Sequence, residues 1–328
     1  MNTQQLRLLL ASSVVGTTWL ATIKIAPAAD FLMIPDSVGD RILLFDHEDG
    51  SLIDNNFING EGLFTTPINA IQVGEEIWVS DQVADSIFRF NLTGGLLSSI
   101  TGGLDNIRGM ELVDGTVYVA NAGTDNGAPG EAVVTFDTQG NNLGSFATGD
   151  PYDIFFYNGE LLINDINSDS DGGEDIDRYN LDDNLLGTFH ESDGLTGIDF
   201  PQQMTQRANG NLLVGGFSAP GGVYEYDPSG TQVAVYDADD GFANRLRAAY
   251  ELGNGNILWS GGDGVVSTNI ATGEFTNIFT VQTEGNRPSM RYIEKLSIPD
   301  TADVPEPATL LGLLAVGTLG LSRRRQSA

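Results

Sequence analysis

The chain of 328 residues contains 45 acidic and 15 basic side chains and no cysteine. A hydrophobic share of 41% argues against a disordered acidic chain, and the lack of cysteine excludes disulfide bonds, so stability must come from a buried core. A net charge of −30 repels nucleic acid and anionic lipid headgroups, and we expect neither as a partner.

The first segment, residues 1–29, has the parts of an export signal. Arg7 precedes an apolar run from Leu8 to Thr22, and small residues follow from Ala26 to Ala29. This order predicts a secretory signal peptide that signal peptidase removes between Ala28 and Asp30. The alternative is an amphipathic first helix of the folded domain.

Two-residue turn signals recur along the chain between short apolar strands. They stand at Gly74-Glu75, Asp114-Gly115, Asn158-Gly159, Asn209-Gly210 and Asn254-Gly255, at steps of 40, 44, 51 and 45 residues. Asn-Gly and Asp-Gly favour type I′ hairpins because both positions accept a positive φ. Each turn is followed by an apolar strand and then by two further strands. This repeat predicts β-propeller blades of four antiparallel strands.

The two ends of the repeat region complete a ring. Residues 31–58 supply only the second, third and fourth strands of a unit, and residues 287–298 form an additional strand at the end. If that strand is the missing inner strand, the ring closes without exposed edges. We therefore predict an all-β fold over residues 30–298: a six-bladed β-propeller of four-stranded antiparallel blades, closed by one C-terminal strand and three N-terminal strands.

These repeats resemble the NHL and gluconolactonase-like group of six-bladed propellers, whose units share the order of glycine turn, apolar strand, Asp, strand and Asp-x-x-Gly. The resemblance implies architecture, and fold does not determine function. Gluconolactonase-like enzymes hold a metal with Glu, Asn and Asp at the channel mouth, and Glu61, Asn69 and Asp153 could be fitted to such a site. A metal-dependent lactonase or hydrolase is therefore the alternative to a binding protein.

A catalytic triad is not expected, and we assign no catalytic residue. The chain has two histidines, His47 in a turn and His190 after an outer strand. Both positions predict solvated side chains.

Aligning the inner strands by their turns brings six polar residues to equivalent places. These residues are Asn69, Arg108, Asp153, Gln203, Arg247 and Arg291. Inner strands begin at one mouth of the channel, so the six side chains should ring that mouth. Three arginines there indicate a site for an anion or a sugar acid. The alternative is that they only neutralise carboxylates, for example Arg108 with Glu111 and Arg291 with Glu294.

The loop between the second and third strands of the fourth blade carries oxygen ligands at a regular spacing. They are Asn167, Asp169, Asp171 and Asp175, with Gly172 at the turn. Calcium takes about six to eight hard oxygens, which such a loop can help to supply. The loop resembles the calcium hairpins of integrin-type propellers, with Asn167 in place of the usual Asp. A structural Ca²⁺ is expected; the alternative is a merely soluble acidic loop.

The C-terminal tail, residues 305–328, joins the propeller through a linker at residues 299–304. Pro305, Glu306 and Pro307 precede 15 uncharged residues and then three arginines. An apolar segment followed by cations predicts a membrane segment with its cationic end in the cytoplasm, although a spanning helix usually needs about 17 to 25 residues. The tail resembles the PEP-CTERM sorting signal of exopolysaccharide-producing Gram-negative bacteria. The resemblance implies processing by an exosortase and a transient or lasting contact with the inner membrane.

These features together predict an exported protein of the cell surface or the extracellular matrix. We expect it to bind exopolysaccharide, another surface protein or a small ligand. A purely structural matrix component is a third class.

Overall fold

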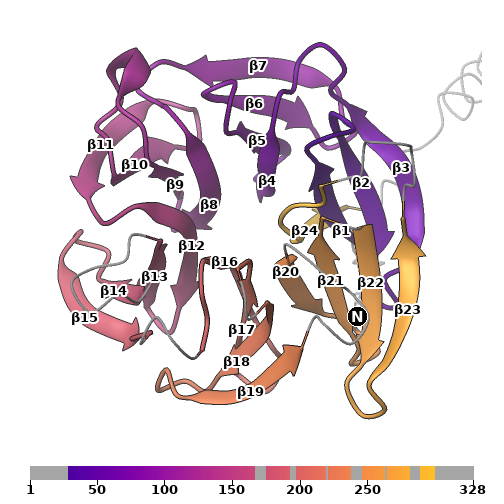
Figure 1. The fold of residues 1–328 in the computed structure, drawn as a ribbon. Helices are drawn as coiled ribbons and strands as arrows, with labels where there is room; N and C mark the ends of the chain where they lie inside the picture. The colour runs from indigo at the N-terminus through magenta and orange to yellow at the C-terminus, as the bar shows by residue number, and fades with distance from the viewer. Residues whose placement is uncertain are drawn as a thin grey trace, which may run out of the picture. The chain divides into compact units, whose positions relative to one another are not determined.

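The computed structural model describes residues 29–166, 175–192, 197–218, 221–237, 246–262, 264–280 and 289–299. These residues contain 24 strands and one short 3-10 helix, η1 (Asp125–Gly127). The strands form six four-stranded sheets arranged as blades around a common axis (Figure 1). The predicted six-bladed β-propeller is confirmed.

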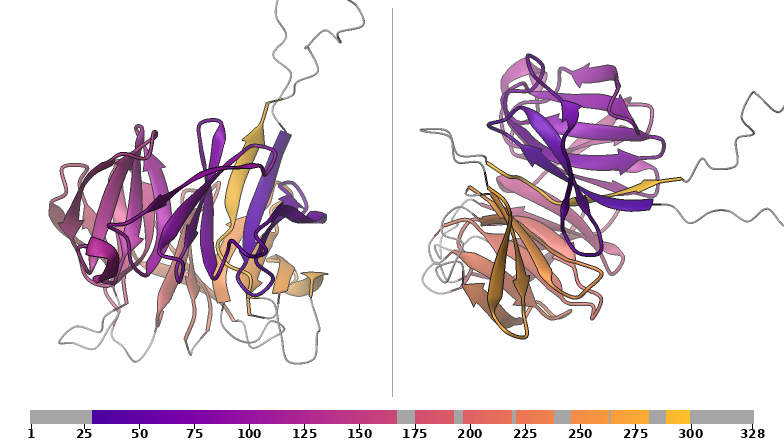
Figure 2. Two further views of the ribbon diagram at one scale, coloured as in Figure 1. Left: turned by 90° about the horizontal axis from the view of Figure 1, so that it is seen from above. Right: turned by 90° about the vertical axis from the view of Figure 1, so that its right-hand side faces the viewer.

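The first blade joins the two ends of the propeller. From the axis outward it contains β24 (Glu294–Ile298), β1 (Ala29–Asp36), β2 (Arg41–Asp46) and β3 (Leu52–Asn59). β1 and β24 pair antiparallel, and Figure 2 shows them side by side although they come from opposite ends of the domain. The predicted closure by one C-terminal and three N-terminal strands is confirmed.

The closing strand begins later than the predicted Arg287. Regular pairing in β24 starts at Glu294, and among the described residues before it an isolated bridge joins Met290 to Asp36.

The other five blades each use four consecutive strands, the first of which is innermost. The second blade contains β4 (Pro67–Val73), β5 (Glu76–Asp81), β6 (Ser86–Asn91) and β7 (Leu96–Thr101). The third contains β8 (Ile107–Val113), β9 (Thr116–Asn121), β10 (Ala132–Asp137) and β11 (Asn142–Ala147). The fourth contains β12 (Pro151–Tyr157), β13 (Glu160–Asp165), β14 (Ile176–Tyr179) and β15 (Leu185–His190). The fifth contains β16 (Pro201–Gln206), β17 (Leu212–Gly216), β18 (Gly222–Tyr226) and β19 (Gln232–Asp237). The sixth contains β20 (Leu246–Glu251), β21 (Ile257–Gly261), β22 (Gly264–Asn269) and β23 (Glu274–Phe279).

The hairpins between first and second strands are of more than one type. Asp114-Gly115 and Asn158-Gly159 have positive φ at both residues, as the type I′ prediction requires. At Asn209-Gly210 and Asn254-Gly255 only the glycine has a positive φ, and its N–H donates to a carbonyl three residues earlier. These two turns are therefore not of type I′, which requires a positive φ at both residues.

In every blade an Asp or Asn ends the third strand or directly follows it, and this residue organises the next turn. Its side-chain oxygen accepts the backbone N–H two residues later, at 2.8 to 3.0 Å. The residues are Asp46, Asn91, Asp137, Asn180, Asp227 and Asn269. Asn and Asp favour such turns because their short side chains reach their own backbone.

The core of the described part lies between the blades. Each pair of neighbouring blades shares one cluster of buried apolar side chains, including the sixth and first blades, where Leu258 and Val265 contact the cluster of Leu32 and Phe45. A smaller cluster of Ile68, Tyr152 and Tyr292 comes from three blades and lies on the axis. Burial between blades therefore holds the ring together.

Candidate functional site

Each inner strand has one extra residue near its start. In β4, Pro67 lies opposite Asp81 and Asn69 opposite Ser80, so the strand has one more residue than its partner. The same irregularity lies in β8, β12, β16 and β20, and between Met290 and Glu294 in the first blade. A bulge breaks the two-residue alternation and re-aims the side chains beside it. Consecutive residues can therefore contribute to the ring interior at this level.

All six residues predicted for the channel mouth are buried at these bulges. They form two successive layers rather than one ring. In each blade, one residue of the inner strand pairs with the last residue of the second strand. The three arginines come directly after this residue: Arg108 after Ile107, Arg247 after Leu246 and Arg291 after Met290. Asn69, Asp153 and Gln203 lie one residue further along. The three arginines are thus equivalent to one another, and the six residues are not all at strictly equivalent places.

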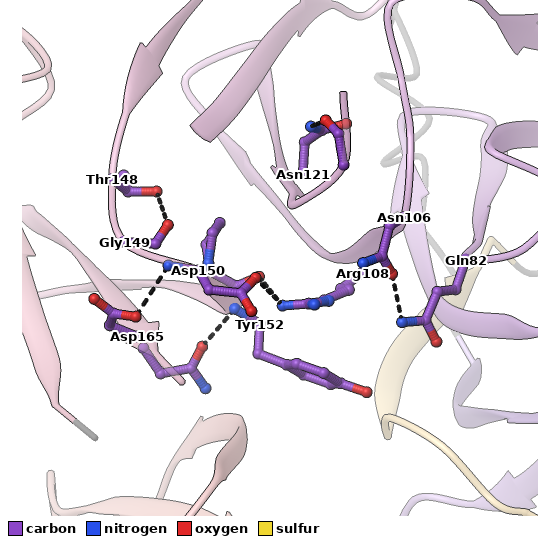
Figure 3. Close-up of polar contacts among 12 residues, drawn as sticks. Gln82, Asn106, Arg108, Asn121, Thr148, Gly149, Asp150, Tyr152 and Asp165 are labelled. Atoms are coloured by element: carbon purple, nitrogen blue, oxygen red, sulfur yellow. Dashed lines mark hydrogen bonds and ion pairs between the residues drawn. The ribbon is translucent and has the colours of Figure 1, made fainter. Parts of the chain in front are cut away.

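Arg108 has an anionic partner at the mouth (Figure 3). Its Nη1 donates to Asp150 Oδ1 at 2.6 Å and to the carbonyl of Pro151 at 2.9 Å. Its guanidinium lies 4.6 Å from the centroid of the Tyr152 ring. Asp150, and not Glu111, therefore pairs with this arginine.

Arg291 makes its described contacts with neutral groups. Arg291 Nε donates to Ser37 Oγ at 2.9 Å, and a further hydrogen bond joins its side chain to that of Tyr152. Burial and the neighbouring charge of Arg247 lower the pKa of Arg291 to about 10. Arg247 Nη1 donates to Gln202 Oε1 at 3.4 Å, and its guanidinium lies 4.7 Å from the centre of the Phe217 ring. The suggested pair of Arg291 with Glu294 is not formed.

Side chains from opposite blades meet on the axis just beyond the arginines. Tyr292 is fully buried and donates its hydroxyl to the carbonyl of Tyr152, across the ring, at 3.3 Å. Gln203 crosses as well: its Nε2 donates to the carbonyl of Ile293 at 3.0 Å, and its Oε1 accepts the Ile293 N–H at 2.7 Å. These contacts divide the arginine layer from the rest of the inner strands.

A group of carboxyls lies beyond this crossing. Glu294 Oε1 accepts Asn69 Nδ2 at 3.1 Å and Gln203 Nε2 at 2.7 Å. Burial raises the pKa of Glu294 to about 7. Burial and the charge of Glu294 also raise the pKa values of Glu111 and Asp153 well above their ordinary range. Asp153 Oδ2 accepts the N–H of Met204 at 2.8 Å.

Sequence reasoning missed Tyr152, Tyr292 and Gln202, and assigned Glu111 and Glu294 only as counter-charges. One signal was present: Glu111 and Glu294 each follow a mouth arginine by three residues on an apolar inner strand. A charged residue in such a strand needs a special environment, which here is the polar axis.

Other predicted positions lie elsewhere or outside the described residues. Glu61 is exposed on the loop before β4, where its charge acts on Asp40, so it is not placed with Asn69 and Asp153. Within the described ranges, no group of three or more His, Asp or Glu could hold a metal ion. Of the calcium-loop residues only Asp175 is described, and it accepts the N–H of Ser192 at 2.9 Å. Calcium at Asn167, Asp169 and Asp171 remains a prediction.

The histidines are less solvated than predicted. His47 is half-buried and its Nε2 lies 3.2 Å from the Tyr250 hydroxyl. His190 is half-buried too, its Nδ1 lies 3.1 Å from the carbonyl of Gly230, and burial lowers its pKa.

The structure thus defines a β-propeller with polar side chains along its axis. Comparison with known protein families indicates where the protein is exported. Residues 303–326 match the PEP-CTERM protein-sorting motif. The motif marks an exported protein that an exosortase processes, and it indicates a cell-surface or extracellular location in Gram-negative bacteria. Among the residues that the structure describes, none form a helix that is long and apolar enough to cross a membrane. The proposed signal peptide and the apolar tail lie outside them.

Solved structures share the fold at low sequence identity. A chain of a nidogen/laminin complex matches with a TM-score of 0.63 and 17% identity, over 81% of this chain and 98% of that one. A protein of unknown function from Bacteroides caccae matches with a TM-score of 0.57 and 15% identity, over 83% and 99%. A streptogramin B lyase matches with a TM-score of 0.52 and 15% identity, over 81% and 91%. No curated protein matches the sequence. These similarities show the fold alone.

Proposed function

We propose that this exported propeller is a binding protein that holds the carboxylate of an acidic sugar at the arginine mouth of its channel. The observation that carries the proposal is Arg291. Its side chain is 8% exposed, and its described partners, Ser37 and Tyr152, are neutral. Burying a cation without a counter-charge is costly, so an anion that enters beside it is strongly favoured. A carboxylate matches the planar fork of a guanidinium.

Aromatic rings beside the arginines favour an organic anion over a simple ion. The Phe200 ring lies 5.2 Å from the ring centres of both Tyr152 and Phe217, which themselves carry Arg108 and Arg247 on their faces. Small-molecule sites usually combine apolar and aromatic walls with a few polar groups. A sugar acid offers both a carboxylate and a ring face.

The overall charge restricts the ligand further. A molecule with a net charge of −30 repels long polyanions along most of its surface. We therefore infer that the ligand is a single acidic residue, such as the end or a side branch of an exopolysaccharide, rather than a continuous polyanion.

Calorimetric titration of the mature protein with glucuronate, with glucose as the neutral match, tests the proposal. We expect saturable binding of glucuronate alone. Arg291→Gln should weaken it at least about tenfold, because charged hydrogen bonds contribute roughly 1.5 to 3 kcal/mol. Arg178→Gln is the control, since Arg178 pairs with Glu160 on an outer part of the fourth blade. If both variants lose the same affinity for glucuronate, the loss reflects the change in overall charge and not this site. Binding of glucose without binding of glucuronate would rule out anion recognition.

A further inference from the structure

A second group of side chains lies on the other side of the axial crossing. Four inner strands each contribute one residue to this group, and the four lie at the same level. Each pairs with the residue of the neighbouring second strand that lies three places before the end of that strand. The four residues are Glu111, Phe155, Tyr250 and Glu294. All four are half-buried, whereas Asn69, Gln203 and Tyr292 above them are buried. Because the crossing separates this level from the arginines, the exposed surface of the four faces the opposite end of the ring.

We propose that this level is a second binding site, which takes the ammonium group of a small amine. It goes beyond the anion site, because it uses different residues and the other end of the channel.

The first argument is charge. Glu294 acts electrostatically on both Glu111 and Asp153, so three carboxyls share one small region. The hydrogen bonds to Glu294 come from the neutral amides of Asn69 and Gln203. The nearby Lys295 pairs with Asp30 at 2.8 Å. A cation at this level would therefore lie beside several carboxyls and favour their ionised form.

The second argument is an acceptor without a donor. Asn69 is fully buried, and its Oδ1 has no hydrogen-bond partner among the described residues. In the contact with Glu294, Nδ2 of Asn69 is the donor, which leaves Oδ1 as the atom without a partner. A buried acceptor that lacks a donor is destabilising, so a ligand that donates there is favoured. An ammonium group has three donors and no acceptor.

The third argument is the aromatic part of the level. Tyr250 lies close enough to Glu294 for the carboxyl charge to act on its hydroxyl, which also contacts His47 at 3.2 Å. Phe155 presents a second half-exposed ring at the same level. Aromatic faces attract ammonium groups by the cation–π interaction, which strengthens where water is excluded.

The same contacts disfavour a calcium ion. Calcium needs about six to eight oxygens at roughly 2.3 to 2.6 Å. Here two amide N–H groups already approach Glu294 Oε1, where a metal would require further oxygens. The described residues also contain no group of three acids or histidines with the geometry to hold a metal.

Titration of the mature protein with butylammonium, with 1-butanol as the neutral match, tests the proposal. We expect one saturable site for butylammonium and no comparable binding of 1-butanol. Glu294→Gln should weaken binding at least about tenfold, because it removes the charged partner of a buried contact. Glu111→Gln provides a second variant at the same level, should the first fail to fold.

Glu75→Gln is the matched control. Glu75 is exposed in the turn between β4 and β5. Its replacement by Gln removes one carboxyl outside the site, so this variant should bind butylammonium with the affinity of the wild type. Equal weakening in Glu75→Gln and Glu294→Gln would overturn the site in favour of diffuse attraction to an acidic surface. Binding of 1-butanol as tight as that of butylammonium would overturn the ammonium assignment. So would a tighter, Glu294-dependent binding of Ca²⁺.

Discussion

Glu294 has a carboxyl whose ionisation opposes folding. Burial raises its pKa from 4.5 to about 7, although the hydrogen bonds from Asn69 and Gln203 act in the other direction. Burial raises the pKa values of Glu111 and Asp153 as well. The folded state therefore binds protons at these carboxyls more tightly than the unfolded state does.

We predict that the free energy of unfolding falls as the pH rises from about 4.5 to about 7, because stability falls with pH wherever the folded state holds more protons. The contribution of Glu294 is fully present below the ordinary carboxyl pKa and is lost as the pH passes through its folded value. Glu294→Gln cannot ionise, so its urea-unfolding midpoint should depend less on pH over this range. Glu75→Gln should keep the wild-type slope. An unchanged slope in Glu294→Gln would show that this carboxyl does not titrate as described.

The six mouth residues could be predicted from the sequence because polar side chains are conspicuous at the start of apolar strands that follow a regular turn. Their division into two layers could not, because an alignment by the turns does not fix which residue lies opposite the end of the second strand. The contacts across the axis could not be predicted from the sequence either. Gln203 and Glu294 lie 91 residues apart in sequence, and Tyr292 and Tyr152 lie 140 apart. Such pairs become neighbours only when the ring closes.

The inner strand β24 stabilises the ring through two kinds of contact. It pairs with β1, and Leu296 packs in the cluster between the first and second blades. Just before it, the Ile293 backbone exchanges two hydrogen bonds with the Gln203 amide of the fifth blade. The closing strand therefore connects parts of the domain that are distant in sequence.

Removing residues 287–328 should abolish the cooperative thermal transition, because it strips the inner strand from the first blade and opens the ring. Removing only residues 305–328 should leave the melting temperature unchanged, since that tail matches a sorting motif. Differential scanning calorimetry of both truncations provides the comparison. A shorter domain that melts like the longer one would show that β24 is dispensable.

The calcium loop of the fourth blade remains a prediction from spacing alone. Asp169, Asp171 and Asp175 place three negative charges in one turn, which a cation would relieve. Millimolar Ca²⁺ should raise the melting temperature by a few degrees, because each kcal/mol shifts a domain of this size by about 2 to 4 °C. Asp169→Ala with Asp171→Ala should remove this shift. A calcium response of the same size in the double variant would indicate diffuse binding.

The ring as a whole is a closed unit that needs no disulfide outside the cell. Buried clusters join every neighbouring pair of blades, and the number of blades could be predicted because each blade repeats the same turns. The sorting motif at residues 303–326 adds the export route.

Glu306→Ala should impair processing in a host that has an exosortase, because it removes the acidic residue of the Pro-Glu-Pro motif. Precursor should then accumulate in the inner membrane fraction, where an immunoblot can detect it. The control is the melting temperature of the propeller, which should be the same in the variant and in the wild type. Normal maturation and release of the variant would contradict this sorting route.

The arginine mouth can be observed directly by NMR of the arginine Nε–Hε groups in the mature protein. We predict that the signals of Arg108 and Arg291, assigned through Arg108→Lys and Arg291→Gln, shift saturably with glucuronate and not with glucose. Arg178, which pairs with Glu160 on the outer part of its blade, should stay unmoved. If Arg178 shifts as much as Arg291, or if glucuronate leaves both mouth arginines unmoved at saturation, the channel mouth is not the anion site.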